Sequence, residues 1–221
     1  MKKSILFLFL LVASQFVIAQ SVQFGIKGGL NLATADRGTL PSGTETKNLA
    51  RFDAGVFANI GFANWSIEPG LFYSQKGFKG NSTFTSQPQP GYEIAINNYK
   101  VEATVNYNYL ELPVNILYNV KIAPGKIFFG GGPYIGYLLS GKYKVIESMD
   151  GTFMPEQKGN YSIGDNGLKR TDFGINGIAG FAFNYHFQLS AGYSYGFTNI
   201  INGADSGVKN RVFNVSVGYS L

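Results

Sequence analysis

Residues 109–120 read YLELPVNILYNV, an apolar stretch that contains a glutamate and a proline. Successive side chains of a β-strand point to opposite faces, so every second residue lies on the same side. One face of this stretch is continuously apolar and consists of Leu110, Leu112, Val114, Ile116, Tyr118 and Val120. The other face carries Tyr109, Glu111, Pro113, Asn115, Leu117 and Asn119. This alternation predicts a strand whose apolar face contacts either a protein core or lipid.

The composition favours lipid. Charged residues make up 14% of the 221 residues, against about 25% in an average soluble domain. Such a small share of charges cannot coat a water-exposed surface. The formal net charge of +5 becomes a mild +3 once Lys2 and Lys3 of the expected leader are left out. No basic cluster interleaves with aromatic residues, so we expect no nucleic-acid partner. The chain has no cysteine, which excludes disulfides and a lipid-anchor cysteine.

The N-terminus resembles an export signal. Residues 1–19 combine Lys2 and Lys3, an apolar stretch over residues 5–13, and the small-residue end Val17-Ile18-Ala19. The apolar stretch is shorter than the ~20 residues that a membrane-spanning helix needs. We therefore expect residues 1–19 to be a cleaved signal peptide and residues 20–221 to form one exported domain.

Eight alternating runs follow the leader, each at least ten residues long. Strands of soluble proteins usually have about 5–6 residues, whereas a tilted membrane-spanning strand needs about 9–11. The runs predict an all-β fold, namely an eight-stranded antiparallel up-and-down transmembrane β-barrel. The predicted strands are residues 22–34, 51–61, 65–78, 107–120, 127–139, 172–184, 187–198 and 211–221.

The connections between these runs alternate in length. Short links join the second run to the third, the fourth to the fifth and the sixth to the seventh. The other four links are long and cover residues 35–50, 79–106, 140–171 and 199–210. Short periplasmic turns and long extracellular loops are typical of outer-membrane barrels. The alternating residues of YEIAINNYKVEATV (92–105) and YKVIESMDGTF (143–153) predict ordered ribbons in two long loops, with a turn at Asp150-Gly151.

The faces of the runs predict a polar lumen. Gly, Asn and Ser point inward, together with the charged residues Lys27, Arg51, Asp53, Glu68, Lys76, Glu111 and Asp172. A soluble lipocalin-like barrel would need many charges on its outer face instead. We expect Glu111 to pair with Lys27 or Arg51, because an unpaired buried charge is costly. Pro69, Pro113 and Pro133 lack a ladder donor, which predicts bulges or broken pairing there.

Aromatic residues at the predicted strand ends suggest interface girdles. This set comprises Trp65, Tyr73, Tyr107, Tyr137, Tyr195 and Tyr219. The inward charges fit either a narrow pore or a lumen filled by side chains, as eight strands allow. The only histidine, His186, lies in a short turn, away from the extracellular rim where a barrel enzyme would place it. We therefore expect no catalytic residue, no metal site and no cofactor.

Six segments in order resemble the PorT-like outer-membrane β-barrel family of the Bacteroidetes. They are FGIKGGLN (24–31), YLELPVNILY (109–118), FFGGGPYIGYLLSGK (128–142), DFGINGIAGFAF (172–183), LSAGYSYGFTNI (189–200) and VFNVSVGYSL (212–221). The resemblance implies an eight-stranded outer-membrane barrel and, for the family's namesake, a part in protein secretion. The chain departs from the usual barrel-assembly signal because it ends in Leu221 instead of an aromatic residue.

These observations predict a non-enzymatic outer-membrane barrel that acts through its long extracellular loops. We expect a structural or interaction component, accessory to protein secretion or envelope assembly. The alternative is a small porin-like transport channel. The expected partners are outer-membrane lipid, the barrel-assembly machinery, and a protein of the envelope or of a secretion system.

Overall fold

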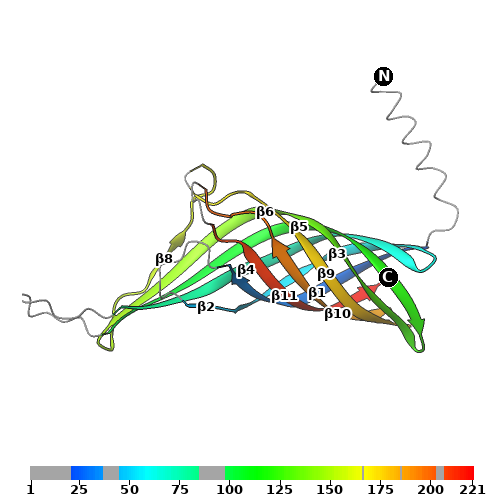
Figure 1. Cartoon of the computed structure of the whole chain (residues 1–221), viewed down its shortest axis with the longest axis horizontal. Coiled ribbons are helices and arrows are strands. Elements are labelled where there is room, and N and C mark those ends of the chain that lie inside the picture. Colours follow the sequence, from blue (N-terminus) through cyan, green and yellow to red (C-terminus); the bar gives the residue numbers. More distant parts are fainter. Residues whose placement is uncertain (1–20, 37–44, 85–97, 166, 185, 203–206) are drawn as a thin grey trace, which may run out of the picture.

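Eight long antiparallel strands form a closed barrel in the computed structural model (Figure 1). The structure describes residues 21–36, 45–84, 98–165, 167–184, 186–202 and 207–221. The long strands are β1 (Ser21–Ala35), β3 (Leu49–Phe62), β4 (Trp65–Phe84), β5 (Tyr99–Ile122), β6 (Gly125–Met149), β9 (Thr171–Phe183), β10 (Phe187–Gly196) and β11 (Asn210–Ser220). The short strands are β2 (Glu45–Lys47), β7 (Thr152–Phe153) and β8 (Gln157–Asn160). The described ranges hold no helix long and apolar enough to cross a membrane.

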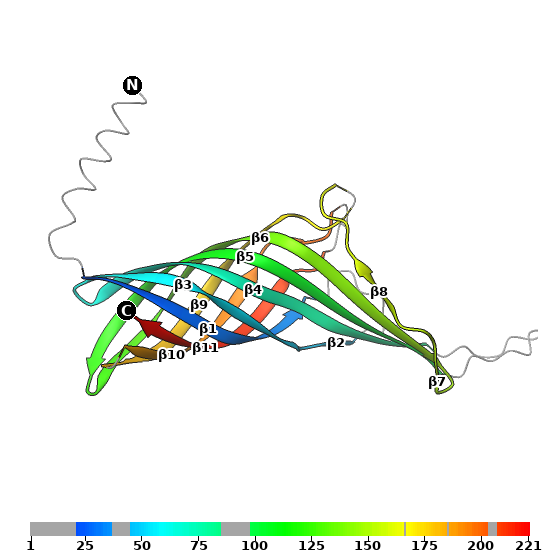
Figure 2. The same cartoon turned by 180° about the vertical axis from the view of Figure 1, so that it is seen from behind.

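Each long strand pairs with the next one along the chain, and β1 pairs with β11 to close the ring. This arrangement confirms the predicted eight-stranded up-and-down barrel. The predicted leader, residues 1–19, lies outside the described residues. The short turns lie together at one end of the barrel, beside the start of β1 and the end of β11 (Figures 1 and 2). His186 lies at this end, as predicted.

The outer surface of the barrel is apolar, as the alternation predicts. Leu110, Leu112 and Ile116 of β5 are 40%, 46% and 52% exposed, respectively, while Tyr109 and Leu117 on the opposite face are 0% and 2% exposed. In a soluble protein apolar side chains are buried, whereas here they are exposed all around the barrel. Examples are Phe52, Val56, Leu189 and Val215. A band of large exposed apolar side chains on a closed barrel is the surface that lipid covers.

Three strands run further than the sequence predicts. At the end opposite the short turns, the pairing of β6 with β9 stops at Tyr137↔Thr171, but β4, β5 and β6 continue together to Phe84↔Tyr99 and Tyr99↔Met149. We call the continuation the ribbon, made of residues 79–84, 99–106 and 140–149. Short strand β2 flanks it on the β4 side, and β7 and β8 flank it on the β6 side. The ribbon forms the tapered left-hand part of Figure 1.

The ribbon ends in the hairpin turn that the sequence predicts at Asp150-Gly151. The φ angles of these two residues are 48° and 84°, which is the left-handed pair that a tight two-residue hairpin turn requires. The strand partners Met149↔Thr152 and Ser148↔Phe153 flank the turn directly. The predicted ordered ribbons are therefore confirmed over residues 99–105 and 143–153, while residues 92–97 of the first ribbon lie outside the described residues.

Strand pairing is interrupted at the three prolines. No ladder pairs lie between Phe57↔Gly70 and Ile60↔Ile67, between Pro69↔Val114 and Phe72↔Glu111, or between Pro113↔Tyr134 and Ile116↔Gly131. The register is the same on both sides of each gap, so broken pairing is confirmed and bulges at the prolines are not found. The shift in register on β5 and β6 lies between Asn108 and Tyr109 instead. It leaves Leu139 as the extra residue of β6.

The glycine run of β6 lies against its neighbours too closely for side chains. A Cβ atom added to Gly132 would lie 1.9 Å from the carbonyl oxygen of Val114, whereas one added to Gly177 would meet nothing within 4 Å. We expect Gly132→Ala to lower the free energy of unfolding by about 3 kcal/mol, the upper end for overpacking, because backbone atoms must move. The control Gly177→Ala will leave it nearly unchanged. Urea unfolding in lipid vesicles measures both, and equal losses would contradict the close approach.

Candidate functional site: the lumen and the ribbon

The lumen holds a buried ion pair near the short-turn end. Lys27 of β1 and Glu68 of β4 lie 2.7 Å apart, with side chains only 6% and 4% exposed. The Lys27 ammonium also lies 4.8 Å from the centre of the Phe57 ring, and Asn59 donates a hydrogen bond to Glu68. Each charge thus has a partner, which a buried charge requires.

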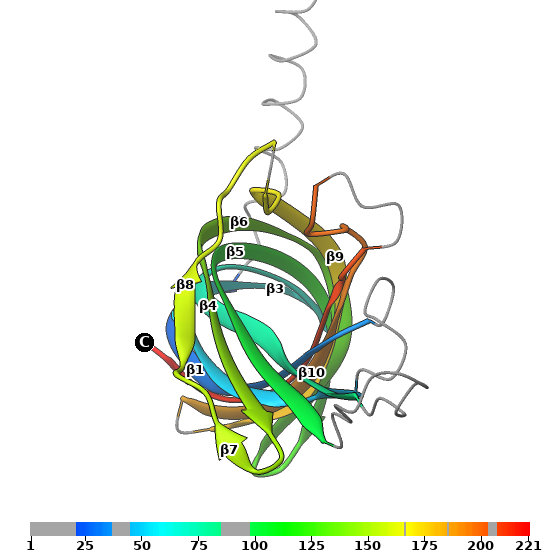
Figure 3. The ribbon, with the colours of Figure 1, turned by 90° about the vertical axis from the view of Figure 1, so that its left-hand side faces the viewer.

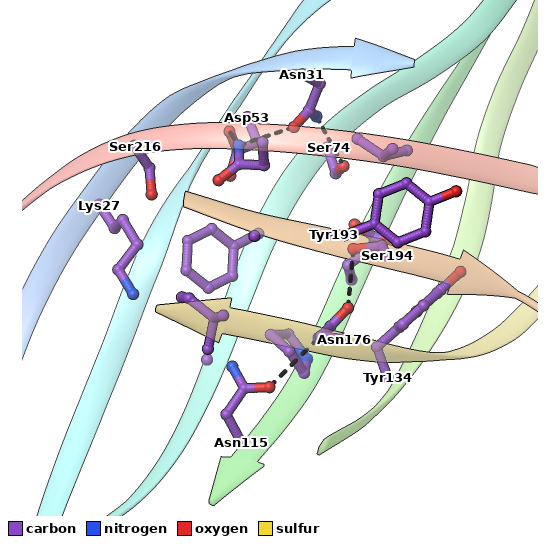
Figure 4. A pocket seen from close by; sticks show the side chains of 18 of the residues that line it. Lys27, Asn31, Asp53, Ser74, Asn115, Tyr134, Asn176, Tyr193, Ser194 and Ser216 are labelled. Atoms are coloured by element: carbon purple, nitrogen blue, oxygen red, sulfur yellow. Dashed lines mark hydrogen bonds between the residues drawn. The ribbon is translucent and has the colours of Figure 1, made fainter. Parts of the chain in front are cut away.

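A small polar cavity of ≈ 100 Å³ lies at the middle of the lumen (Figure 4). Amide and hydroxyl side chains link its walls. Asn214 donates to both Asn31 and Asp53 at 2.9 Å, and Asn176 connects Ser194 to Asn115. The remaining space is close to the volume of a few water molecules, so side chains largely fill the lumen.

Lys76 forms the most deeply buried charged cluster. It is 1% exposed and pairs with Glu111 and with Asp172, whose Oδ2 atom lies 3.3 Å from the ammonium nitrogen. Asp172 also accepts hydrogen bonds from Tyr134 at 3.3 Å and from Asn210 at 2.8 Å. Two carboxylates face one ammonium, and the two neutral donors stabilise the excess negative charge.

A glycine makes room for this cluster. Glu111, Gly136 and Asp172 occupy one row across β5, β6 and β9, because Gly136 pairs with both acidic residues. The Lys76 ammonium also lies 4.4 Å from the centre of the Tyr134 ring, a distance at which a cation and a ring face attract. The cluster therefore joins four strands around one cation.

The predicted partners of Glu111 were wrong. Glu111 pairs with Lys76, whereas Lys27 is taken by Glu68. Arg51 lies near the ribbon end and donates from Nε to Asn106 at 2.6 Å. The cause is the stagger of neighbouring strands in a barrel, which sets the heights at which side chains meet across the lumen. Asp53, the remaining predicted lumen charge, has Asn214 as its hydrogen-bond partner.

An apolar cap closes the lumen at the ribbon end. It consists of Leu168, Ile200 and Val208, which are 2%, 0% and 2% exposed. These side chains pack against the inward residues Phe78, Val105, Tyr107, Tyr109 and Leu138. Backbone hydrogen bonds from Lys169 to Ile200 and from Ile200 to Val208 join two loop segments in the cap.

Five of the six predicted girdle aromatics lie on the outer surface. Trp65, Tyr137, Tyr195 and Tyr219 are 38–47% exposed, and Tyr73 is half-buried beside Phe52. Tyr107 is a correction, because it is 2% exposed and packs inside against the cap. It has the parity of Tyr109 and Glu111, so its side chain points into the lumen.

The polarity of the strands inverts where the ribbon begins. Below the ribbon, the apolar side chains point outward to lipid. Within it, the register carries the inward parity of Phe78 and Val105 to an inner face that is mostly apolar. Its members are Phe84, Tyr99, Val101, Ala103, Tyr143, Val145 and Met149, with Gly80, Ser82 and Glu147 among them. The outer face carries Lys79, Asn81, Thr83, Lys100, Glu102, Thr104, Lys142, Lys144, Ile146 and Ser148. A mostly polar outer face indicates that the ribbon stands in water.

Polar contacts hold parts of the ribbon in place. Lys144 of β6 forms an ion pair with Glu156 at 2.5 Å, and the hydrogen bond from Lys144 lowers the pKa of the Glu156 carboxyl. On the inner face, the hydrogen bond with Glu147 raises the pKa of the Tyr99 hydroxyl. Strand β8 pairs only with β6, so its other backbone edge is unpaired among the described residues (Figure 3).

Comparison with protein families now places the fold. The sequence model of the protein family described as "Outer membrane protein beta-barrel domain" matches residues 18–202 of this chain. The chain belongs to this family. Its members are outer-membrane barrels, which agrees with the lipid-facing band and the short turns described above. A search of curated proteins found no match.

Solved structures similar to this outer-membrane barrel include those of three bacterial proteins. The attachment invasion locus protein Ail of Yersinia pestis, in complex with the heparin analogue sucrose octasulfate, is 16% identical, with a TM-score of 0.40 and coverage of 91% of this chain and 99% of that chain. Neisserial surface protein A is 13% identical, with a TM-score of 0.39 and coverage of 91% and 99%. OprG from Pseudomonas aeruginosa is 17% identical, with a TM-score of 0.34 and coverage of 92% and 97%.

Sequence reasoning missed several features of this outer-membrane barrel domain. The cap residues Leu168, Ile200 and Val208 come from two different long loops and carry no pattern that marks them. The alternation of YKVEATV does signal a mostly apolar face on the ribbon. The alternation alone does not say whether this face points inward or outward. The register with the neighbouring strands decides that. In the described ranges, no cluster of three or more acidic or histidine side chains could hold a metal ion.

Proposed function

We propose that this outer-membrane barrel is a non-enzymatic interaction protein that binds its partner on the ribbon. The inner face of the ribbon supports this proposal most directly. Near the cap its apolar residues are buried, but towards the tip Phe84 and Met149 are 46% and 36% exposed. Exposed apolar side chains on an ordered sheet that stands in water favour a binding surface.

The partner segment that we propose is an extended polypeptide. Strand β8 offers an unpaired edge at Gln157–Asn160, to which an incoming strand can add by backbone hydrogen bonds. A strand added there places every second side chain on the inner face of the ribbon. Apolar side chains of the added strand at these positions would complement Tyr143 and Val145 of β6. Affinity then comes from the backbone and specificity from the alternating side chains.

The partner is, in our proposal, a protein of the cell envelope. The resemblance to PorT-like barrels supports a role as an accessory of protein secretion or envelope assembly. We also propose that residues 1–19 are removed on export, that lipid surrounds the apolar band, and that the barrel-assembly machinery inserts the chain. Mass spectrometry of the purified protein tests the cleavage, because the predicted mature chain begins at Gln20.

The alternative function is a small transport channel. Phe57 and Phe128, which are 3% and 2% exposed, fill the lumen on one side of the central cavity, and the cap fills the other. These groups would have to move before a solute could pass. Conductance across planar bilayers at the level of a porin would favour the channel.

Trimming the ribbon tests the interaction proposal. Replacing residues 79–104 with Asn-Gly joins Phe78 to its register partner Val105. Replacing residues 142–160 with Asn-Gly joins Gly141 to Tyr161, whose backbones are hydrogen-bonded at 2.9 Å. We expect the doubly trimmed barrel to insert and resist heat in gels, yet to lose the envelope proteins that cross-link to the full chain. Undiminished cross-linking and an unchanged envelope phenotype would contradict the proposal.

A further inference from the structure

A second cavity opens at the short-turn end of the barrel, which faces the periplasm in outer-membrane barrels. This vestibule has a volume of ≈ 350 Å³, room for roughly ten water molecules. Phe57 lines both the vestibule and the central cavity and is 3% exposed, so its ring separates them. The vestibule is therefore a pocket that can be entered from one side of the membrane.

The polar lining of the vestibule consists mainly of cations and amides. Its charged or titratable members are Lys121, Lys126 and His186, and no carboxylate lines it. Five carboxamides surround them: Gln23, Asn59, Asn119, Asn184 and Gln188. Glu68, the nearest inward carboxylate of β4, is already paired with Lys27 at 2.7 Å. The vestibule is thus positive, with amide donors around the charge.

The two lysines face each other directly. Lys121 of β5 and Lys126 of β6 are register partners beside the turn at Ala123-Pro124. Like charges at directly opposite positions on one face destabilise a strand pair. In the described part of the chain, neither lysine has an ion-pair partner. An anion between the two ammonium groups would turn this repulsion into attraction.

Gln188 supplies a second, independent sign of a ligand. It lies in the same row as the lysines, because Ala182 pairs with both Gln188 and Lys126. Its side chain is buried, at 6% exposed, and its amide nitrogen has no hydrogen-bond partner among the described residues. A buried donor without a partner costs free energy, and a ligand oxygen in the vestibule would remove that cost after a small rotation of the side chain.

We propose that the vestibule binds an oxyanion, a carboxylate or a phosphate, presented from the periplasm. Lys121 and Lys126 bind its charge, and Gln188 donates a hydrogen bond to one of its oxygens. The surrounding carboxamides can pair with peptide groups, which favours a peptide carboxylate over inorganic phosphate. This site is independent of the ribbon, so either proposal can fail without the other.

Titration calorimetry on the full chain in a non-ionic detergent tests the site. The three probes are acetyl-alanyl-alanine with a free carboxylate, the same dipeptide as its amide, and inorganic phosphate. We expect saturable binding of the free acid, at least tenfold weaker binding of the amide, and weakening as salt is added. Saturation by phosphate with a weaker response to the dipeptide would support the oxyanion site and identify phosphate as its source. Absence of binding for both anions would overturn the proposal.

Matched variants locate the binding. The double change Lys121→Gln, Lys126→Gln should weaken anion binding at least tenfold, and Gln188→Leu should weaken it severalfold. The control Lys142→Gln removes a charge from the outer face of the ribbon and should leave binding unchanged. Removing the facing charges relieves repulsion, so the double variant should unfold at the same urea concentration as the original chain or a higher one. An affinity that all three variants leave unchanged would place the anion elsewhere and overturn the proposal.

Discussion

Replacing Lys76 with methionine will lower the free energy of unfolding of the barrel by about 3–5 kcal/mol, the usual loss when one partner of a buried ion pair is removed. The ammonium of Lys76 lies between Glu111 and Asp172, and Asp172 is fully buried. Without it the buried carboxylate of Asp172 and the half-buried carboxylate of Glu111 face each other across Gly136 with no cation between them.

Unfolding in urea, followed by the fluorescence of Trp65, measures this loss, because Trp65 is the only tryptophan of the chain. The triple variant Lys76→Met, Glu111→Gln, Asp172→Asn should recover most of the stability, since no charge is then unpaired. Lys144→Met is the matched control. It breaks the exposed pair with Glu156, and such pairs contribute about 1 kcal/mol or less. A Lys76→Met barrel as stable as this control would show that the cluster is not held by charge.

Placing a charge on the inner face of the ribbon will lower the affinity of the barrel for an added peptide strand more than tenfold. Val145 and Ile146 are neighbours on β6, both β-branched and both half-buried, but they lie on opposite faces. Burying a valine side chain contributes about 1.5 kcal/mol or more, and tenfold in affinity corresponds to about 1.4 kcal/mol. Val145→Lys should therefore abolish most binding, while Ile146→Lys should leave it within about twofold.

A defined probe makes this measurable without knowing the natural partner. The probe is a lysine-flanked peptide of alternating threonine and valine, and its control carries proline in place of each threonine. Proline lacks the backbone donor that strand addition needs. Surface plasmon resonance with immobilised barrel should detect the first peptide and not the second. Equal effects of the two lysine substitutions, or equal binding of the two peptides, would refute the proposed binding face.

Local patterns sufficed for the strands and for the side of the sheet on which most residues lie. Period-two alternation places Leu110 and Glu111 on opposite faces whatever the neighbouring strands do. The Asp150-Gly151 turn is equally local, because two consecutive residues with positive φ determine it. These features need no knowledge of register, so one stretch of sequence predicts them.

Contacts across the lumen could not be predicted in the same way. Whether Glu111 meets Lys27, Arg51 or Lys76 depends on the stagger of four strands, and a shift of two residues leaves every alternation unchanged. The vestibule has the same origin, because Gln188 and Lys121 share a row only through the register of β9 and β6. The cap depends on two loops that meet over the barrel, and no local rule describes such a meeting.

The inversion of polarity at the base of the ribbon has a consequence for how such proteins diversify. The ribbon is an extension of the barrel hairpins, so its reach can change without a new domain or a new linker. Two residues added to each of its strands keep every side chain on its face, whereas a single added residue exchanges the faces. The extra residue Leu139 is one such odd insertion, and it lies where β6 leaves the membrane-spanning barrel. Related chains should therefore differ in ribbon length mainly by even steps, while the barrel beneath keeps its register.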